Sequence, residues 1–325
     1  MSRLTVVLLL SLSVGAAFAQ APQSGAGYPT KAIRLIVHFP PGGSTDTVSR
    51  IFAPVLAERL GKPVIVDNRP GGNGVIGAEI AAKSPPDGHT LFVASASVLV
   101  LNPILYQKIP YDPARDFAPI TLLVTSPFIV ATNPSLFPAA SVRELIAAVK
   151  AKGQVAFASG GNGSAMHLAG ELFRQLAGLD MFHVPYKGNG PAMTALAGGE
   201  VPIAFVDLGS TSALRKSGRV QVLAIAAAQR TTLAPEIPTA AESGLANWEA
   251  LGWFGLVAPA GTPAEIIRRL SAEMTAILRM PEVRARIIAT GAEPAPNTPA
   301  EFDSYIKSET GKWAKVIKQA RIKVD

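Results

Sequence analysis

The chain of 325 residues has no cysteine, which excludes disulfide bonds and thiolate metal ligands. Aromatic residues make up only 6% of it, and its basic residues are scattered, although the formal net charge is +7. Because nucleic-acid binding needs a basic stripe with stacking aromatics, no nucleic-acid partner is expected. The four histidines (His38, His89, His167 and His183) lack a metal-ligand spacing such as H-x-x-x-H, so neither a metal nor another cofactor is expected. The scattered positive charge favours small anionic ligands.

Long apolar runs are absent after the first twenty residues, so the rest of the chain has no segment of the roughly 20 apolar residues that a membrane-spanning helix needs. The first segment has Arg3, then an apolar core over residues 4–12, then small residues at Ala17 and Ala19. This pattern is typical of a secretory signal peptide over residues 1–19, cleaved after Ala19. We therefore expect export to the periplasm, where loss of Arg3 lowers the net charge from +7 to +6.

The remaining length, about 300 residues, is more than one hydrophobic core usually organises, and it predicts two lobes. Short β-branched runs alternate with helical periodicities, and the alternation restarts after the first third of the chain. It predicts an α/β fold in which each lobe is a mostly parallel sheet flanked by helices. We expect lobe 1 to hold residues 28–127 and 251–325, and lobe 2 to hold residues 128–250. The two crossings, near 122–129 and 246–254, predict a hinge that lets the lobes close around a ligand.

The expected elements follow this alternation. Strands are predicted at 33–39, 64–66, 90–94, 128–131, 155–158, 182–184, 203–206, 222–226 and 252–258, and helices at 44–60, 77–82, 141–150 and 164–177. Thr262 and Thr298 each precede the same Pro-Ala-Glu sequence. This sequence predicts two further helices, each with a threonine N-cap and proline at its first position.

Two glycine-rich loops, one in each expected lobe, join a strand to a helix. The first loop, 39–46 (FPPGGSTD), contains the candidate ligand residues Phe39, Gly42, Gly43, Ser44, Thr45 and Asp46. Glycines let backbone approach a ligand, and the exposed amides and dipole of a helix start attract an anion. Ser44 or Thr45 can cap the helix or donate to the ligand. Asp46 can bond first-turn amides or meet a ligand amine.

The second loop, 159–164 (SGGNGS), has the same chemistry and contains the candidates Ser159, Gly163 and Ser164. One such loop per lobe, each at the carboxyl end of a sheet, suits an anion held from both sides. His167, one turn further on, can donate to a ligand carboxylate or simply satisfy the loop. Ser95 and Ser97, just past the third strand, are either further donors or ordinary loop serines.

Two catalytic or cofactor interpretations compete with ligand binding. An exported hydrolase would use Ser164, His167 and Asp207 as nucleophile, base and orienter. Ser164 lacks the G-x-S-x-G elbow and nothing in the sequence places Asp207 beside His167, so no enzyme is expected. Residues 72–77 (GNGVIG) match the dinucleotide fingerprint formally. However, residues 68–71 (NRPG) intervene after the preceding strand, and 92–101 contain no acid, so a dinucleotide is not expected.

Short motifs spread over nearly the whole expected mature chain carry a family resemblance. They are Tyr28 and Pro29 with Lys31, 40–46 (PPGGSTD), 66–71 (VDNRPG), 76–78 (IGA), 86–88 (PDG), 111–113 (YDP) with Asp116 and Phe117, 183–188 (HVPYKG), 237–239 (IPT) and 242–244 (ESG). Through their order and number, the chain resembles the Bug family of periplasmic receptors associated with tripartite tricarboxylate transporters. The resemblance implies a two-lobed periplasmic-binding-protein fold in which loops from both lobes hold a carboxylate, partly through ordered waters.

The resemblance also places residues at the ligand. It matches 39–46, 159–164 with His167, and Ser95 with Ser97 to ligand loops, and Asp207 to a cleft position that varies with the ligand. His38 and 206–209 (VDLG) depart from the family's pattern, so the ligand stays open among aliphatic dicarboxylates, amino acids and aromatic acids.

The sequence therefore predicts a monomeric, non-enzymatic receptor in the periplasm. We expect it to capture a small carboxylate and to deliver it to the membrane subunits of a tripartite tricarboxylate transporter. A sensing partner for a two-component system stays open as an alternative.

Overall fold

The computed structural model describes residues 27–42 and 44–322, apart from the side chain of Ser212. The expected signal peptide and Gly43 lie outside the described residues. The strands are β1 Ile33–Val37, β2 Val64–Asn68, β3 Thr90–Ser95, β4 Phe117–Thr132, β5 Val155–Ser159, β6 Met181–Pro185, β7 Ile203–Asp207, β8 Gln221–Ile225, β9 Leu251–Pro259 and β10 Glu293–Pro294. In the part of the chain described, no helix is both long and apolar enough to cross a membrane.

The helices lie between these strands much as the alternating pattern predicts. They are α1 Ser44–Leu60, α2 Val75–Ala82, α3 Asn102–Leu105, α4 Pro113–Asp116, α5 Val142–Lys152, α6 Ala165–Ala177, α7 Asn189–Gly198, α8 Ser212–Lys216, α9 Ala264–Arg279, α10 Pro281–Ile288 and α11 Pro299–Ala320. Short helical turns of other types are η1 Gly72–Gly74, η2 Ser97–Leu101 and η3 Gly209–Thr211. The predicted helix at 44–60 has the bounds of α1.

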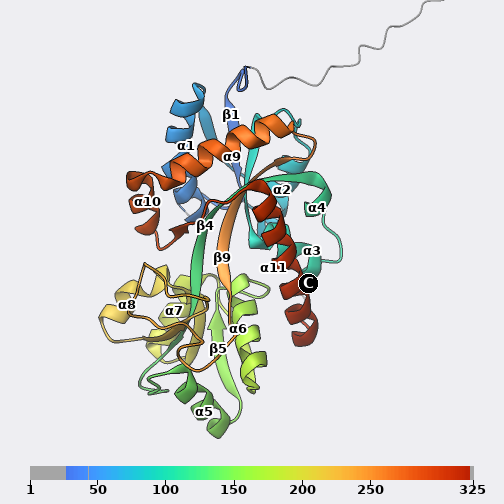
Figure 1. Ribbon diagram of the computed structural model, residues 1–325. Coiled ribbons are helices and arrows are strands. Elements are labelled where there is room, and N and C mark those ends of the chain that lie inside the picture. The colour runs from blue at the N-terminus through green and yellow to red at the C-terminus, as the bar shows by residue number, and fades with distance from the viewer. Residues whose placement is uncertain (1–26, 43, 323–325) are drawn as a thin grey trace, which may run out of the picture.

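Two sheets share the long strand β4 (Figure 1). In sheet A the order is β2-β1-β3-β9-β4, and the first part of β4, up to Pro127, pairs with β9. In sheet B the order is β4-β7-β5-β6, and the last part of β4, from Phe128, also pairs with β8. The chain therefore passes from sheet A to sheet B within β4. It passes back at Ala250, which hydrogen-bonds Ala226 and Phe128 of the second half just before β9 begins.

The sheets are mixed, which corrects the expectation of mostly parallel sheets. β1 runs parallel to β2 and β3, and β5 runs parallel to β6 and β7. β4 is antiparallel to β7, β8 and β9, and β9 is antiparallel to β3. The reason is topological, since β4 carries the chain out of sheet A and β9 brings it back.

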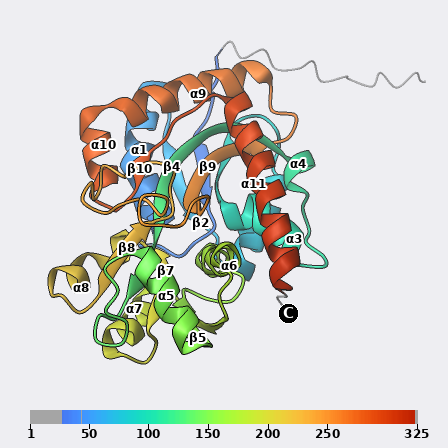
Figure 2. The same ribbon diagram turned by 60° about the horizontal axis from the view of Figure 1, so that its bottom comes forward.

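Helices cover both faces of each sheet. On one face of sheet A, α1, α9 and α10 pack over a core that includes Leu35, Phe52 and Leu270 (Figure 2). In sheet B, successive residues of β7 alternate between two cores, with Phe205 facing the α6 side and Ala204 facing the α7 side. Burial on both faces explains why these strands read as continuous apolar runs in the sequence.

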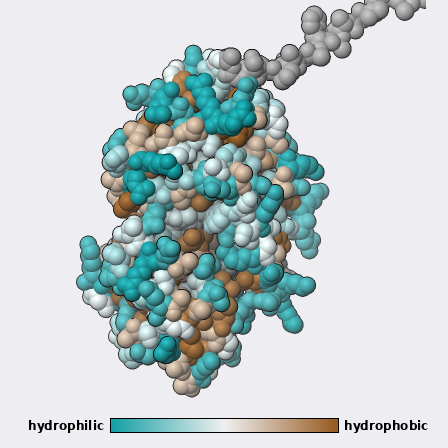
Figure 3. Space-filling view, viewed as in Figure 1, coloured by the Kyte–Doolittle hydropathy of each residue, from teal (hydrophilic) through white to brown (hydrophobic). Residues whose placement is uncertain are grey.

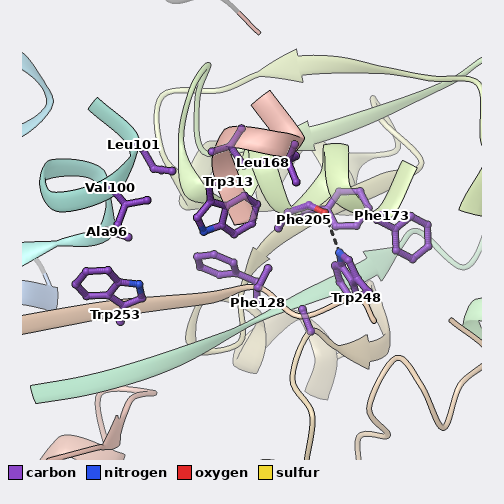
Figure 4. Packing of buried hydrophobic residues seen from close by; sticks show 14 of the residues in the cluster. Ala96, Val100, Leu101, Phe128, Leu168, Phe173, Phe205, Trp248, Trp253 and Trp313 are labelled. Carbon is purple, nitrogen blue, oxygen red and sulfur yellow. Dashed lines mark hydrogen bonds between the residues drawn. The ribbon is translucent and has the colours of Figure 1, made fainter. Parts of the chain in front are cut away.

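One apolar core continues from sheet A into sheet B. Figure 4 shows Trp253 and Phe128 beside Trp313, with Phe205 and Trp248 further along the same cluster. Helix α11, which carries Trp313, contacts both η2 and α6. The Gln175 side chain of α6 also donates to the Val316 carbonyl of α11 at 3.2 Å. The C-terminal helix therefore packs against both halves of the molecule.

The two identical helix-start sequences fold differently. Thr298 is the N-cap of α11, and it forms the predicted capping box with Glu301. The expectation for Thr262 is wrong, because its hydroxyl donates to the Pro259 carbonyl at 2.7 Å and α9 begins only at Ala264. The end of β9 supplies that carbonyl, so tertiary context overrides the local signal.

Candidate functional site

A pocket of about 490 Å³ lies where the two sheets meet. Its walls come from β4 and β9, which cross between the sheets, and from the loops at the ends of β1, β3, β5 and β7. Seven of the predicted ligand residues line it: Phe39, Ser44, Thr45, Ser95, Ser97, Ser164 and Asp207. Gly42, Asp46, Ser159, Gly163 and His167 do not line this pocket, and Gly43 is outside the described residues.

The first glycine loop brings the start of α1 to the pocket. Ser44 and Thr45 in the first turn line it, and the Thr45 hydroxyl is buried there without a hydrogen-bond partner. Amides of a first helical turn have no acceptor inside their own helix, so this end of α1 offers donors. The loop thus presents backbone and hydroxyl donors together.

Asp46 acts within the loop rather than in the pocket. Its carboxylate accepts from the Gly42 amide at 2.9 Å, from Arg50 at 2.9 Å and from the Asn68 side chain at 2.9 Å. Burial raises the pKa of Asp46, but these hydrogen bonds outweigh it and hold the pKa below its usual value. Of the two roles open to Asp46 in the sequence, its contacts fit one that holds the loop in shape.

The second glycine loop brings the start of α6 to the opposite wall. Ser164, the N-cap of α6, accepts from the His167 amide at 3.1 Å and donates to the Gly161 carbonyl at 2.8 Å. Ala165 and Met166, in the first turn, line the pocket beside it. Two helix starts, one from each half of the molecule, therefore face the same space.

His167 stabilises the second glycine loop from outside the pocket. Its Nδ1 accepts from the Gly163 amide at 3.1 Å, and its ring stacks on His183 with 3.7 Å between centroids. His183 Nε2 lies 2.7 Å from the Ser159 hydroxyl. Burial lowers the pKa of His167 to about 3, with the neighbouring His183 and Arg174 adding to the effect, and burial lowers the pKa of His183 to about 4. Both rings are neutral at physiological pH and hold the loop by hydrogen bonding.

This arrangement does not assemble a hydrolase. The Ser164 hydroxyl bonds Gly161 and the His167 backbone rather than an imidazole nitrogen. Asp207 accepts from the Ser210 amide at 2.8 Å and from the Asn189 side chain, not from a histidine. The three residues of the catalytic alternative are therefore not linked as nucleophile, base and orienter.

The pocket also contains residues that sequence reasoning missed. Asn73, Ser126, Asn189, Trp253 and Thr290 line it. Trp253 Nε1 and Asn189 Oδ1 are buried without a hydrogen-bond partner, as is the Thr45 hydroxyl. Asn189 follows the 183–188 motif directly, which was a usable signal, whereas Trp253 looks like any apolar strand residue. Three buried unpartnered polar groups in one pocket indicate a place where a ligand or water completes the hydrogen bonding.

The GNGVIG segment has a packing role. A Cβ at Gly74 would lie 2.5 Å from His38 Cδ2 and 2.6 Å from Val98 Cγ2, and one at Gly77 would lie 2.9 Å from His38 Cβ. Gly74 also has a positive φ of 91°. These glycines are therefore needed to let the His38 ring sit under the pocket.

Comparisons with known proteins show which family the chain belongs to. A family model described as tripartite tricarboxylate transporter family receptor matches residues 48–322. Protein BugT of Bordetella pertussis is 38% identical over 326 residues, which cover 100% of this chain and 99% of BugT.

Two solved structures extend the comparison to ligands. R. palustris Rpa4515 with adipate is 33% identical with a TM-score of 0.79, covering 91% of this chain and 99% of that one. MatC from Rhodopseudomonas palustris with bound malate is 32% identical with a TM-score of 0.74, covering 89% of this chain and 100% of that one. Fold and pocket together define a solute-binding protein, not an enzyme. The chain belongs to the tripartite tricarboxylate transporter receptor family, which includes the Bug proteins that its motifs resemble.

Proposed function

We propose that this protein binds a small carboxylate in the pocket between its sheets and delivers it to the integral membrane subunits of a tripartite tricarboxylate transporter. The observation that carries the proposal is that the starts of α1 and α6, from opposite halves, line one pocket. Their first-turn amides and dipoles favour an anion bound between them. The adipate and malate of the two related structures are anions of the same class.

The unpartnered donors of the pocket support the same ligand class. The Thr45 hydroxyl and the Trp253 Nε1–H are both hydrogen-bond donors without a partner, and a carboxylate can accept several hydrogen bonds at once. Ser164 holds the α6 helix start in place rather than binding by its own hydroxyl. In the proposed complex, backbone amides therefore provide much of the binding.

The proposed function includes domain closure in the periplasm. We place lobe 1 at residues 28–127 and 251–325 and lobe 2 at residues 128–250, with the signal peptide removed after Ala19. The passage of the chain between sheets at Pro127–Phe128 and at Ala250 supports these bounds. A ligand that bridges both helix starts binds the closed state better than the open one, and so shifts the population toward closure.

Replacement of Thr45 by valine tests the site. The change keeps the side-chain shape but removes a buried hydroxyl, and we expect carboxylate affinity to fall about 10-fold to 100-fold because a hydrogen bond to a charged group is worth about 1.5–3 kcal/mol. Calorimetric titration with a panel of mono- and dicarboxylates, first ranked by thermal shift, measures the change.

Thr132 offers a matched control. Its hydroxyl is also buried and unpartnered, but Thr132 lies on β4 outside the pocket. Thr132→Val is expected to bind with wild-type affinity. Equal losses in both variants, or no loss in either, would remove Thr45 from the site, and a panel in which no carboxylate shifts the melting temperature would refute the proposed function.

A further inference from the structure

The buried His38 determines which way one hydrogen bond in the pocket points. Its Nδ1 lies 3.0 Å from the Val93 carbonyl, and its Nε2 lies 2.9 Å from the Ser95 hydroxyl. A carbonyl only accepts hydrogen bonds, so Nδ1 carries the proton. The ring is 1% exposed, and burial lowers the pKa of His38 to about 4, so at neutral pH Nε2 has only a lone pair.

It follows that Ser95 faces the ligand as an acceptor. A serine hydroxyl has one proton, and a bare Nε2 can only accept, so that proton is committed to His38. Toward the pocket, the Ser95 oxygen therefore presents only its lone pairs. A ligand carboxylate at this point would be repelled, because both it and the Ser95 oxygen are hydrogen-bond acceptors. A ligand N–H or O–H could instead donate a hydrogen bond to Ser95.

Two other uncharged polar groups of the pocket are also hydrogen-bond acceptors rather than donors. Ser126 also lines it, and its hydroxyl proton goes to the Gly291 carbonyl at 3.1 Å. The Asn189 amide donates to Asp207, and Asn189 Oδ1 is a buried acceptor without a partner beside Gly160, another lining residue. Thus three uncharged acceptors line the same space.

Asp207 adds a negative charge to this set. Its carboxylate lines the pocket and is hydrogen-bonded by Asn189 and Ser210, but no cationic side chain of the described residues lies within ion-pair distance of it. Neither lysine, arginine nor histidine is among the described pocket-lining residues. A partly buried carboxylate without a cation favours a positively charged group on the ligand.

We propose that His38 is a positioning residue which makes Ser95 a hydrogen-bond acceptor, and that the pocket selects carboxylates which also carry a protonated amine. The helix starts of α1 and α6 take the carboxylate, and Ser95, Asn189 and Asp207 take the ammonium group. The inference rests on the proposed carboxylate site and narrows its ligand to zwitterionic amino acids.

The packing around His38 keeps its ring in this orientation. Phe39 and Phe92 contact the ring at centroid distances of 4.3 and 5.5 Å, and Gly74 and Gly77 leave the space that it fills. Packing therefore fixes the plane of the ring, and of the two flipped ring positions that fit this space only the observed one makes both hydrogen bonds, to Val93 and to Ser95.

Matched ligand pairs test the selection. Calorimetric titration compares aspartate with succinate, glutamate with glutarate, and 4-aminobutyrate with butyrate, so that each pair differs chiefly in the amine. We expect the amine-bearing member of at least one pair to bind tenfold or more tightly, and Asp207→Asn and Ser95→Ala to reduce that ratio to about threefold or less. Ser271→Ala, a buried serine of α9 outside the pocket, should keep the wild-type ratio.

The outcomes separate this inference from the proposed function. If acids without an amine bind as tightly as their partners in every pair, the selection is wrong while the carboxylate site stands. If no member of any pair binds, both fail.

His38→Phe tests the positioning role, because it keeps a ring and removes the Nε2 acceptor. The freed Ser95 proton can then be donated to a carboxylate, so we expect affinity for the acids without an amine to rise as the amine preference falls. A merely structural defect would weaken both members alike, and that result would overturn the role of His38. Nitrogen-15 NMR of the wild-type histidines provides a measurement independent of folding, with the proton expected on Nδ1 of His38. A proton on Nε2 would also overturn the inference.

Discussion

Acidification from pH 7 to pH 4 is expected to remove roughly 9 kcal/mol of the folding free energy before opposing carboxyl groups are counted, because buried neutral histidines resist protonation only in the folded chain. His38 has a pKa of about 4 in the fold against an ordinary value of 6.5, and each pH unit of difference is worth about 1.4 kcal/mol, which makes about 3 kcal/mol for this residue. His167 and His183, which stack on each other and have pKa values of about 3 and about 4, each contribute a similar loss. Since folded domains have only about 5–15 kcal/mol in total, the loss is large.

The direction follows from which state binds protons. Above pH 6.5 both states have neutral histidines, so these residues make no pH-dependent contribution. Between pH 6.5 and 4 these histidines bind protons in the unfolded chain but stay neutral in the folded chain, so the free energy of unfolding falls. Glu171, whose pKa is raised by burial against the pull of Arg174, acts in the opposite direction and offsets part of this loss. Carboxyl groups with a lowered pKa, such as Asp46, lose their contribution at lower pH.

Urea unfolding followed by circular dichroism at pH 7, 6, 5 and 4 measures the effect. His38→Phe and His183→Phe keep an aromatic ring at each position without a titrating nitrogen, and each should flatten the pH dependence. An unfolding free energy that stays constant between pH 7 and 4.5 in the wild type would contradict the prediction.

Replacement of Gly255 by alanine is expected to destabilise the fold by about 3 kcal/mol, through overpacking of the core. A Cβ at Gly255 would lie 2.0 Å from Cζ and 2.6 Å from Cε1 of Phe302. Phe302 is 0% exposed and packs edge-on against Trp253, so its ring cannot move aside freely. The contact joins β9, which crosses between the sheets, to the first turn of α11.

A double-mutant cycle separates this contact from general damage. Phe302→Ala alone should cost about 4 kcal/mol by leaving a cavity. In the double variant the new methyl occupies part of that cavity, so the loss should be about 2 kcal/mol smaller than the sum of the single losses. Urea unfolding gives all three values.

Gly311 in α11 provides the control, because nothing lies within 4 Å of a Cβ at that position. Gly311→Ala should stabilise the fold by about 0.5–1 kcal/mol through helix propensity. If the free energy of unfolding of Gly255→Ala lies within about 0.5 kcal/mol of the wild-type value, the Phe302 ring moves aside and the prediction is wrong.

The elements that sequence reasoning placed well are those with local signals. The helix predicted at 44–60 has the bounds of α1, and most strands are right to within one or two residues; the short β10 was missed, and β4 proved longer than predicted. Strand direction was not predictable, because β4 and β9 become antiparallel neighbours only when the chain crosses between the sheets twice. The same limit explains Thr262, whose hydroxyl is taken by a carbonyl at the end of β9.

In the pocket, too, features with a local sequence signal were predictable, and contacts between distant residues were not. Both glycine loops reach it, through Ser44 and Thr45 on one side and Ser164 on the other, and both were recognisable from glycines placed between a strand and a helix. His167 was predicted beside the loop, but the residue that it stacks on, His183, comes from another strand. Which loop residues face the ligand and which hold the loop was therefore a tertiary question.

The sequence by itself determined the alternation of strands and helices, the two glycine loops and the family, because each depends on short-range patterns or on motifs in order. Only the tertiary structure decided that the two loops share a pocket with buried unpartnered groups. It alone also decided the polarity of Ser95, because the proton of this hydroxyl is directed by His38, 57 residues away on another strand end, which in turn is oriented by the Val93 carbonyl. Hydrogen-bond direction depends on such three-dimensional chains of contacts, which no local pattern encodes.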